Sequence, residues 1–165
     1  DVMKAQLLKG NLSNDMTLTP EDNVANTGQK DLSNKVVLVV DDSSLILKTT
    51  SRMFIKEGFE VETAQNREEA LKLMRSNLYL FVLSDIQMPV MDGLEMAQRL
   101  RQLEKDNATS GKVSHRPQHI VGMSANSDAE TRDDSLSSGM NSFIPKPVRI
   151  GELLKHLTHH IDNQV

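Results

Sequence analysis

The fold is decided by the stretch from Ser84 to Gly93, which reads SDIQMPVMDG. It follows the apolar run 79–83, a predicted buried strand, and it leads into an amphipathic pattern that predicts a helix. Pro89 and Gly93 mark the connection as a turn. Asp85 therefore stands where a strand ends, so we expect its carboxylate at the edge of a sheet and not in a core.

Strand and helix patterns alternate on both sides of this stretch. Continuous apolar runs predict strands at 36–40, 59–63, 79–83, 120–123 and 142–144. Apolar residues at helical spacing follow the strands, with inner faces that include Ile46, Thr50, Met53, Phe54, Ala70, Leu73, Met74, Met96, Ala97, Leu100, Leu103, Ile150, Leu153, Leu154, Leu157 and Ile161. Five such pairs with short connections predict an α/β fold: a doubly wound, five-stranded parallel sheet flanked by five helices.

Local signals predict the helix ends and the domain boundary. Predicted caps are Ser43 or Ser44, Asn66 with Glu69, and Ser127 with Glu130, and predicted ends are Gly58 and Gly139. Residues 1–10 could form a short helix, and the polar segment 11–34 resembles a linker. We therefore expect a flexible tail at 1–34 and a domain at 35–165. Residues 104–118 are predicted to be a long polar connection that is mobile or contacts a partner.

Composition excludes several classes of function. The chain has 165 residues and a net charge of −4 without a long basic run, so we expect no nucleic-acid binding. No apolar run reaches the roughly 18–20 residues of a membrane span, and the first residues do not show the pattern of a signal peptide. The absence of cysteine excludes disulfides and thiolate sites. We expect a cytoplasmic domain, within a parent chain that can itself be membrane-associated.

Polar residues gather at the predicted carboxyl ends of the strands, which share one edge of a parallel sheet. They are Asp41, Asp42, Asp85, Ser124 and Lys146. Two carboxylates about 5 Å apart repel by roughly 3 kcal/mol at an effective dielectric near 20. Such a cluster favours a hard cation such as Mg²⁺, and the lysine can neutralise a phosphoryl group. The pattern indicates metal-assisted phosphate chemistry, with Asp85 as a candidate nucleophile.

These motifs resemble the receiver domain of two-component response regulators. The matching stretches are VVDDSS at 39–44, SDIQMPVMDG at 84–93, GMSA at 122–125 and FIPKP at 143–147. The resemblance covers residues from about 35 to 161. It implies a flavodoxin-like sheet with strand order 2-1-3-4-5.

The resemblance also implies a role for each site residue. Asp85 would accept a phosphoryl group from the phosphohistidine of a histidine kinase or a histidine phosphotransfer protein. Asp42, Asp85 and the backbone carbonyl of Gln87 would ligate Mg²⁺ directly, while Asp41 would hold a water of the metal. Lys146 would pair with the phosphoryl group, and the Lys146–Pro147 bond resembles one that is often cis.

Ser124 and Phe143 occupy the switch positions of the family. Phosphorylation would draw Ser124 towards the phosphoryl group and let Phe143 move inward, which would alter the face formed by the fourth helix, the fifth strand and the fifth helix. The chain departs from the family at Phe143, where tyrosine is commoner, so this switch lacks a hydroxyl.

These observations leave three hypotheses for the function. The leading one is a phosphorelay receiver that catalyses its own phosphorylation and dephosphorylation, either free-standing or at the C-terminus of a hybrid sensor histidine kinase. The non-Met start, the polar leading segment and the end of the pattern at 161 favour the hybrid kinase. The second is a Mg²⁺-dependent hydrolase with an aspartyl-phosphate intermediate, although Gln87 stands where a second acid would be needed. The third is a binding module of the same fold that is never phosphorylated.

Overall fold

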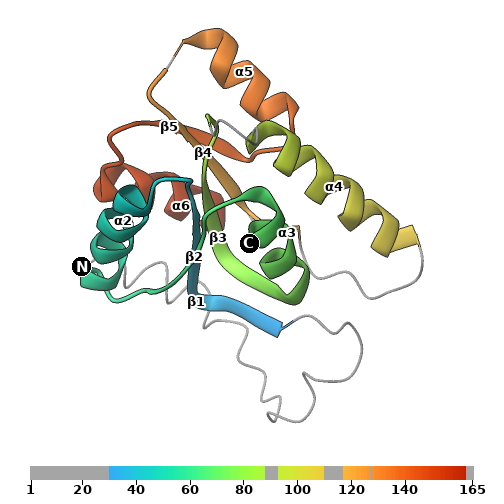
Figure 1. Cartoon of the computed structure of the whole chain (residues 1–165), viewed down its shortest axis with the longest axis horizontal. Coiled ribbons are helices and arrows are strands. Elements are labelled where there is room, and N and C mark those ends of the chain that lie inside the picture. Colours follow the sequence, from blue (N-terminus) through green and yellow to red (C-terminus); the bar gives the residue numbers. More distant parts are fainter. Residues whose placement is uncertain (1–29, 88–92, 110–116, 127, 163–165) are drawn as a thin grey trace.

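The computed structural model describes residues 30–87, 93–109, 117–126 and 128–162. A five-stranded sheet lies at its centre, in the order β2-β1-β3-β4-β5, and every neighbouring pair of strands is parallel (Figure 1). The strands are β1 (Lys30–Val40), β2 (Glu60–Ala64), β3 (Asn77–Asp85), β4 (Ile120–Ser124) and β5 (Ser142–Pro145). The predicted fold class and strand order are confirmed.

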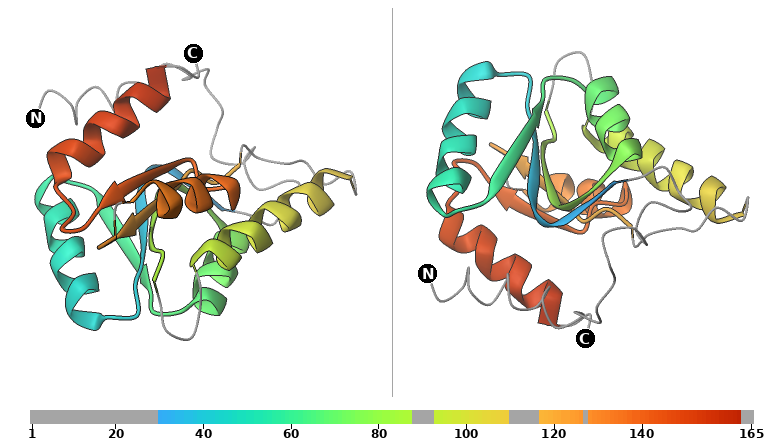
Figure 2. Two further views of the ribbon diagram at one scale, coloured as in Figure 1. Left: turned by 90° about the horizontal axis from the view of Figure 1, so that it is seen from above. Right: turned by 90° about the horizontal axis from the view of Figure 1, so that it is seen from below.

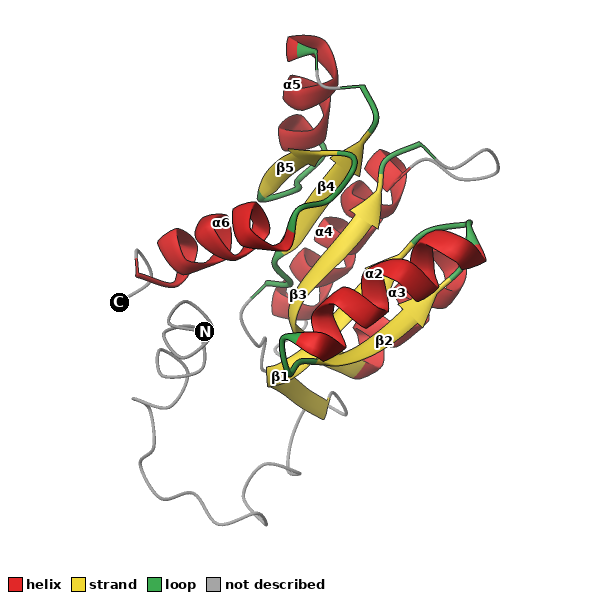
Figure 3. Cartoon of the chain, turned by 90° about the vertical axis from the view of Figure 1, so that its left-hand side faces the viewer, coloured by secondary structure: helices red, strands yellow, loops and turns green. Residues whose placement is uncertain are grey.

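The helices of the described residues are α2 (Ser44–Lys56), α3 (Arg67–Ser76), α4 (Gly93–Thr109), α5 (Ala129–Ser137) and α6 (Ile150–Asp162). α2 and α6 cover one face of the sheet, and α3 and α4 cover the other (Figures 2 and 3). α5 contacts β5 at one side of the molecule. The sheet is therefore buried on both faces, as its continuous apolar strands require.

The alternation of side chains along β1 explains why its apolar run is unbroken. Val37 and Val39 face the core of α2 and α6, whereas Val36, Leu38 and Val40 face the core of α3 and α4. On the α2 side, Phe54 packs edge-on against Phe59 and Phe81, with ring centroids 6.0 and 5.5 Å apart. These two cores hold the carboxyl ends of the strands in a fixed arrangement.

Two strands begin earlier than the sequence predicts. β1 starts at Lys30 and not at Val36, because Lys30, Asp31 and Leu32 pair with the first residues of β3 before a register shift between Leu32 and Val37. β3 accordingly starts at Asn77. Residues 30–34, predicted as tail, thus belong to the sheet, while residues 1–29 lie outside the described part.

The helices differ from prediction in two places. α4 continues to Thr109, so residues 104–109 of the predicted loop are helical, and residues 110–116 lie outside the described part. The predicted cap at Ser127 is wrong: Asp128 caps α5 and accepts a hydrogen bond from the Thr131 N–H. Ser43 caps α2, and Gly58 and Gly139 follow helices with φ of +90° and +104°, as glycines in this position favour.

Candidate functional site

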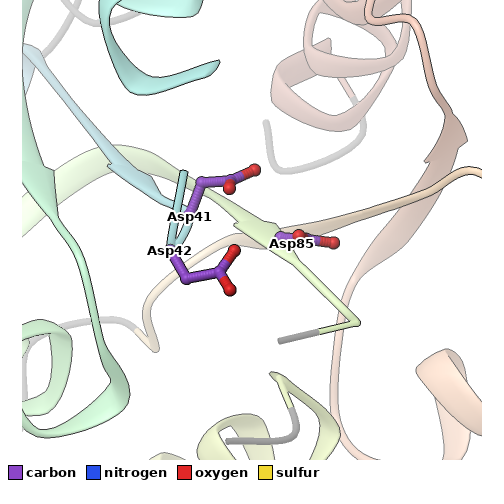
Figure 4. Close-up of side chains that lie close together, drawn as sticks. All are labelled: Asp41, Asp42 and Asp85. Carbon is purple, nitrogen blue, oxygen red and sulfur yellow. The ribbon is translucent and has the colours of Figure 1, made fainter. Parts of the chain in front are cut away.

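Three carboxylates meet where β1 and β3 end. Asp41 follows β1 directly and Asp85 ends β3, and these strands are hydrogen-bonded neighbours in the sheet. One oxygen from each of Asp41, Asp42 and Asp85 lies within 4.8 Å of the others (Figure 4). Asp41 and Asp85 are buried while Asp42 is exposed, so the cluster opens to solvent on one side.

Lys146 supplies the positive charge of this cluster. It follows β5, and its Nζ lies 3.1 Å from Oδ2 of Asp85 and 3.5 Å from Oδ2 of Asp41. One ammonium facing three carboxylates leaves the site negatively charged. Burial raises the pKa of Asp41, and the Asp85 carboxylate raises it further, against the lowering effects of the Ser43 N–H and Lys146.

The three carboxylates offer only oxygen ligands, and Asp42 leaves the cluster partly exposed to solvent; oxygen ligands are the set that Mg²⁺ prefers. A divalent cation would relieve the repulsion that one lysine leaves uncompensated. The residues present therefore fit a magnesium site, with Asp42 as the ligand most open to the water molecules that Mg²⁺ retains.

Backbone groups hold the two buried carboxylates in place. The N–H of Ser43 donates to Oδ1 of Asp41 at 2.8 Å, and the N–H of Gln87 donates to Oδ1 of Asp85 at 3.1 Å. Gln87 is exposed beside the cluster. Each carboxylate thus keeps Oδ1 on its own loop and turns Oδ2 towards Lys146.

Gly93 is the last residue of the stretch SDIQMPVMDG, and its contacts explain why a glycine stands there. Its N–H donates to the carbonyl of Ile86, and a Cβ at this position would lie 2.4 Å from the carbonyl oxygen of Asp85. Only glycine lets α4 begin this close to the backbone of Asp85. The sequence predicted a turn at Gly93 but not its close approach to the backbone of Asp85.

The predicted switch residues lie on the next two strands. Ser124 ends β4 and is fully buried, and its Oγ accepts a hydrogen bond from the N–H of Asn126 at 3.1 Å. Its carbonyl accepts from the N–H of Lys146 at 2.8 Å, which ties β4 to the lysine. Phe143 is half-buried opposite Gly122, against the core of α3 and α4. The Lys146–Pro147 bond is cis, as expected.

Asn126 is the residue of this region that sequence reasoning missed. Its backbone N–H donates to Oγ of Ser124, and its side-chain amide donates to Oδ2 of Asp128 at 2.8 Å. The spacing Asn-x-Asp before a helix is its sequence signal, because both residue types bond to nearby backbone and cap helices.

The chain belongs to the response regulator receiver domain family, whose model matches residues 37–158. The fold and the site thus define a receiver domain of two-component phosphorelay signalling.

Histidine kinases are among the curated relatives of this stretch. The chain is 34% identical over 128 residues to hybrid signal transduction histidine kinase B of Dictyostelium discoideum, covering 73% of this chain and 6% of that protein. It is 32% identical over 128 residues to the sensor histidine kinase RcsC of Escherichia coli, covering 78% and 12%. The chain therefore spans only a small part of these relatives.

Solved structures agree with the assignment. One similar structure is the complex of the receiver domain of Ssk1 from Saccharomyces cerevisiae with the histidine phosphotransfer protein Ypd1. The match has a TM-score of 0.67 and 28% identity, and it covers 75% of this chain and 86% of that one. A CheY-like receiver domain protein from Methanospirillum hungatei gives a TM-score of 0.64 at 29% identity, with coverage of 79% and 95%. Within the described residues, no helix is both long and apolar enough to cross a membrane.

Proposed function

We propose that Asp85 accepts a phosphoryl group from a phosphohistidine, with Mg²⁺ held at Asp41, Asp42, Asp85 and the backbone carbonyl of Gln87. The observation that carries this proposal is the placement of Asp85, buried on a strand end, between Lys146 at 3.1 Å and two further carboxylates. Negative charge concentrated around one nucleophile is unfavourable unless cations balance it. Lys146 and a bound Mg²⁺ would together supply this balancing positive charge.

The transfer needs little from the protein beyond position and charge. An oxygen of Asp85 forms a bond to phosphorus while the P–N bond to the donor imidazole breaks, and the electron pair of that bond stays on nitrogen. Lys146 neutralises charge on the phosphoryl oxygens. Bound Mg²⁺ would supply further charge neutralisation. The N–H of Gln87 keeps Oδ1 of Asp85 oriented during the reaction. Hydrolysis of the acyl phosphate returns the carboxylate.

Phosphorylation adds close to two negative charges beside Ser124 and Lys146. Ser124 then turns its hydroxyl towards the phosphoryl group, Phe143 moves inward, and the face formed by α5, β5 and α6 changes. This rearrangement is a shift between two populations of the domain.

The proposed donor is a histidine phosphotransfer protein or a histidine kinase. Two findings support this donor. A similar structure holds a receiver domain together with the phosphotransfer protein Ypd1, and histidine kinases are among the curated relatives. We further propose that the domain works in the cytoplasm as part of a hybrid sensor histidine kinase, since two curated relatives, both from Dictyostelium discoideum, are hybrid signal transduction histidine kinases.

Labelling with acetyl phosphate and Mg²⁺ tests the proposal. We expect one phosphoryl group per chain by intact-protein mass, none in Asp85→Asn, and full labelling in Asp133→Asn, an exposed acid on α5. Unchanged labelling of Asp85→Asn would refute the assignment. Multiple-turnover release of phosphate from small phosphate esters would instead favour the hydrolase, and a folded chain that is never labelled would favour the binding module.

A further inference from the structure

Helix α5 is anchored unevenly along its length. None of the described residues 128–134 is buried, and only Thr131 is half-buried among them. Burial begins at Ser135 and continues with Ser138 and Met140 at the other end. α5 therefore has no buried apolar residue of its own and packs through small hydroxyl side chains near its C-terminus.

Arg101 of α4 holds that C-terminal end. Its Nε donates to the carbonyl of Gly139 at 2.9 Å, and one terminal nitrogen donates to both the carbonyl of Gln118 and Oδ1 of Asn141, at 2.8 and 2.9 Å. A Cβ on Gly139 would lie 2.7 Å from Cγ of Arg101, so the arginine stem lies directly on this glycine. Figure 1 shows this end of α5 beside α4.

The acceptors of Arg101 are themselves fixed. Oδ1 of Asn141 also accepts from the N–H of Ile120, at the start of β4. Glu104 pairs with Arg101 at 2.8 Å and accepts from the N–H of Gln118 at 2.9 Å. The Gln118 amide reaches the carbonyls of Met74 and Asn77 and the N–H of Tyr79. This network joins α3, α4 and the amino ends of β3, β4 and β5.

The N-terminal end of α5 is held differently, by polar contacts that lead to the site. Asn126 donates its N–H to Oγ of Ser124 and its side-chain amide to Asp128. Asp128 is the exposed cap of α5. If Ser124 turns towards a phosphoryl group, its Oγ leaves the N–H of Asn126, and this end of the helix loses its link to β4.

We propose that Arg101 acts as a clamp on Gly139, so that phosphorylation moves the N-terminal end of α5 about a fixed C-terminal end. The clamp is a positioning device: it touches no reacting atom and decides which end of the helix moves. The inference rests on the proposed phosphorylation of Asp85. It goes further by assigning the pivot to one arginine and the release to the Ser124–Asn126 contact.

Distances between spin labels test the pivot directly, since the chain has no cysteine of its own. Lys72→Cys on α3 serves as the reference, paired in one protein with Ala129→Cys and in a second with Ser137→Cys, all at exposed positions. We expect beryllofluoride with Mg²⁺ to shift the distance to position 129 and to leave the distance to position 137 unchanged. Equal shifts at both positions, or a shift at 137 alone, would overturn the clamp.

Arg101→Ala should release the second end, so that beryllofluoride then shifts the distance to position 137 as well. Arg99→Ala is the matched control, an exposed arginine on the same helix, and should behave as the wild type. An unchanged distance to position 137 in folded Arg101→Ala contradicts the proposal.

Amide exchange without any phosphoryl mimic provides a second measurement on the same variants. The N–H groups of Gly139, Met140 and Asn141 should exchange about tenfold faster in Arg101→Ala, and that of Thr131 should not change. Equal acceleration at both ends contradicts the clamp, even where the labelled variants fold poorly. Occupancy of Asp85 by beryllofluoride is read by fluorine NMR in the labelled samples. If Asp85 is occupied but position 129 does not move relative to a fixed position 137, only the clamp is refuted. If Asp85 cannot be occupied, the proposed function is refuted as well.

Discussion

The ammonium of Lys146 lies 3.1 Å from Oδ2 of Asp85, although β4 separates their strands in the sheet. The pairing is possible because Lys146 follows β5 directly and its N–H is held by the carbonyl of Ser124. The lysine thus reaches across the end of β4 to the proposed nucleophile.

Replacing Lys146 with methionine keeps most of the stem and removes the charge. We expect phosphorylation by acetyl phosphate to slow on the order of 100-fold, because charge on the phosphoryl oxygens loses its fixed counter-charge. The rate of mass increase measures the effect. Lys72→Met, at an exposed position on α3, should react at the wild-type rate. Equal rates in the two variants would remove Lys146 from the chemistry.

Gly93→Ala should destabilise the domain by about 1–3 kcal/mol, because the new methyl group would press on the carbonyl oxygen of Asp85. Chemical denaturation followed by circular dichroism measures the free energy of unfolding. Gly151→Ala is the control: a Cβ there meets nothing within 4 Å, so stability should stay within about 0.5 kcal/mol. Tolerance of alanine at position 93 would show that α4 does not need this close approach.

Asp41→Asn should make the metal-free domain more stable at neutral pH. Folding raises the pKa of Asp41 above its ordinary value of 3.8, mainly through burial. The folded state therefore binds the proton more tightly, and stability is lost as pH rises from 3.8 through the raised pKa. Asparagine avoids this loss. Its advantage should shrink as pH falls towards 4, as unfolding titrations in EDTA at several pH values will show. An advantage that is independent of pH would have another cause.

Mg²⁺ should stabilise the wild-type domain by about 1.4 kcal/mol when its free concentration is about ten times Kd, because only the folded cluster binds it. EDTA should reverse the gain. Asp42→Asn should lose most of it, and Asp133→Asn, on the exposed side of α5, should keep it. Thermal unfolding at fixed pH, with and without Mg²⁺, measures this stabilisation in the wild type and in the two variants. A full gain in Asp42→Asn would mean that Mg²⁺ binds elsewhere.

The sequence predicted the convergence of Asp41, Asp42, Asp85 and Lys146, because each residue stands directly at or after the end of a strand and parallel strands end at one edge. It did not predict what depends on distant partners. β1 extends to Lys30 because its first residues pair with the start of β3 at Asn77. α4 extends past Glu104, whose carboxylate accepts from the N–H of Gln118, 14 residues later. Ser127 and Asp128 are both good caps by residue type, and only the path of the chain selects Asp128.

The polar residues at the two edges of the sheet impose different demands on the sequence. At the carboxyl edge, three carboxylates face the one ammonium of Lys146, and the proposed Mg²⁺ would balance the excess negative charge. At the amino edge, Arg101, Gln118 and Asn141 bond to protein groups. Substitutions at the amino edge can therefore change the free energy of unfolding without altering the carboxylate cluster. Natural selection can act on how long the domain survives and on how long its signal lasts through separate sets of residues.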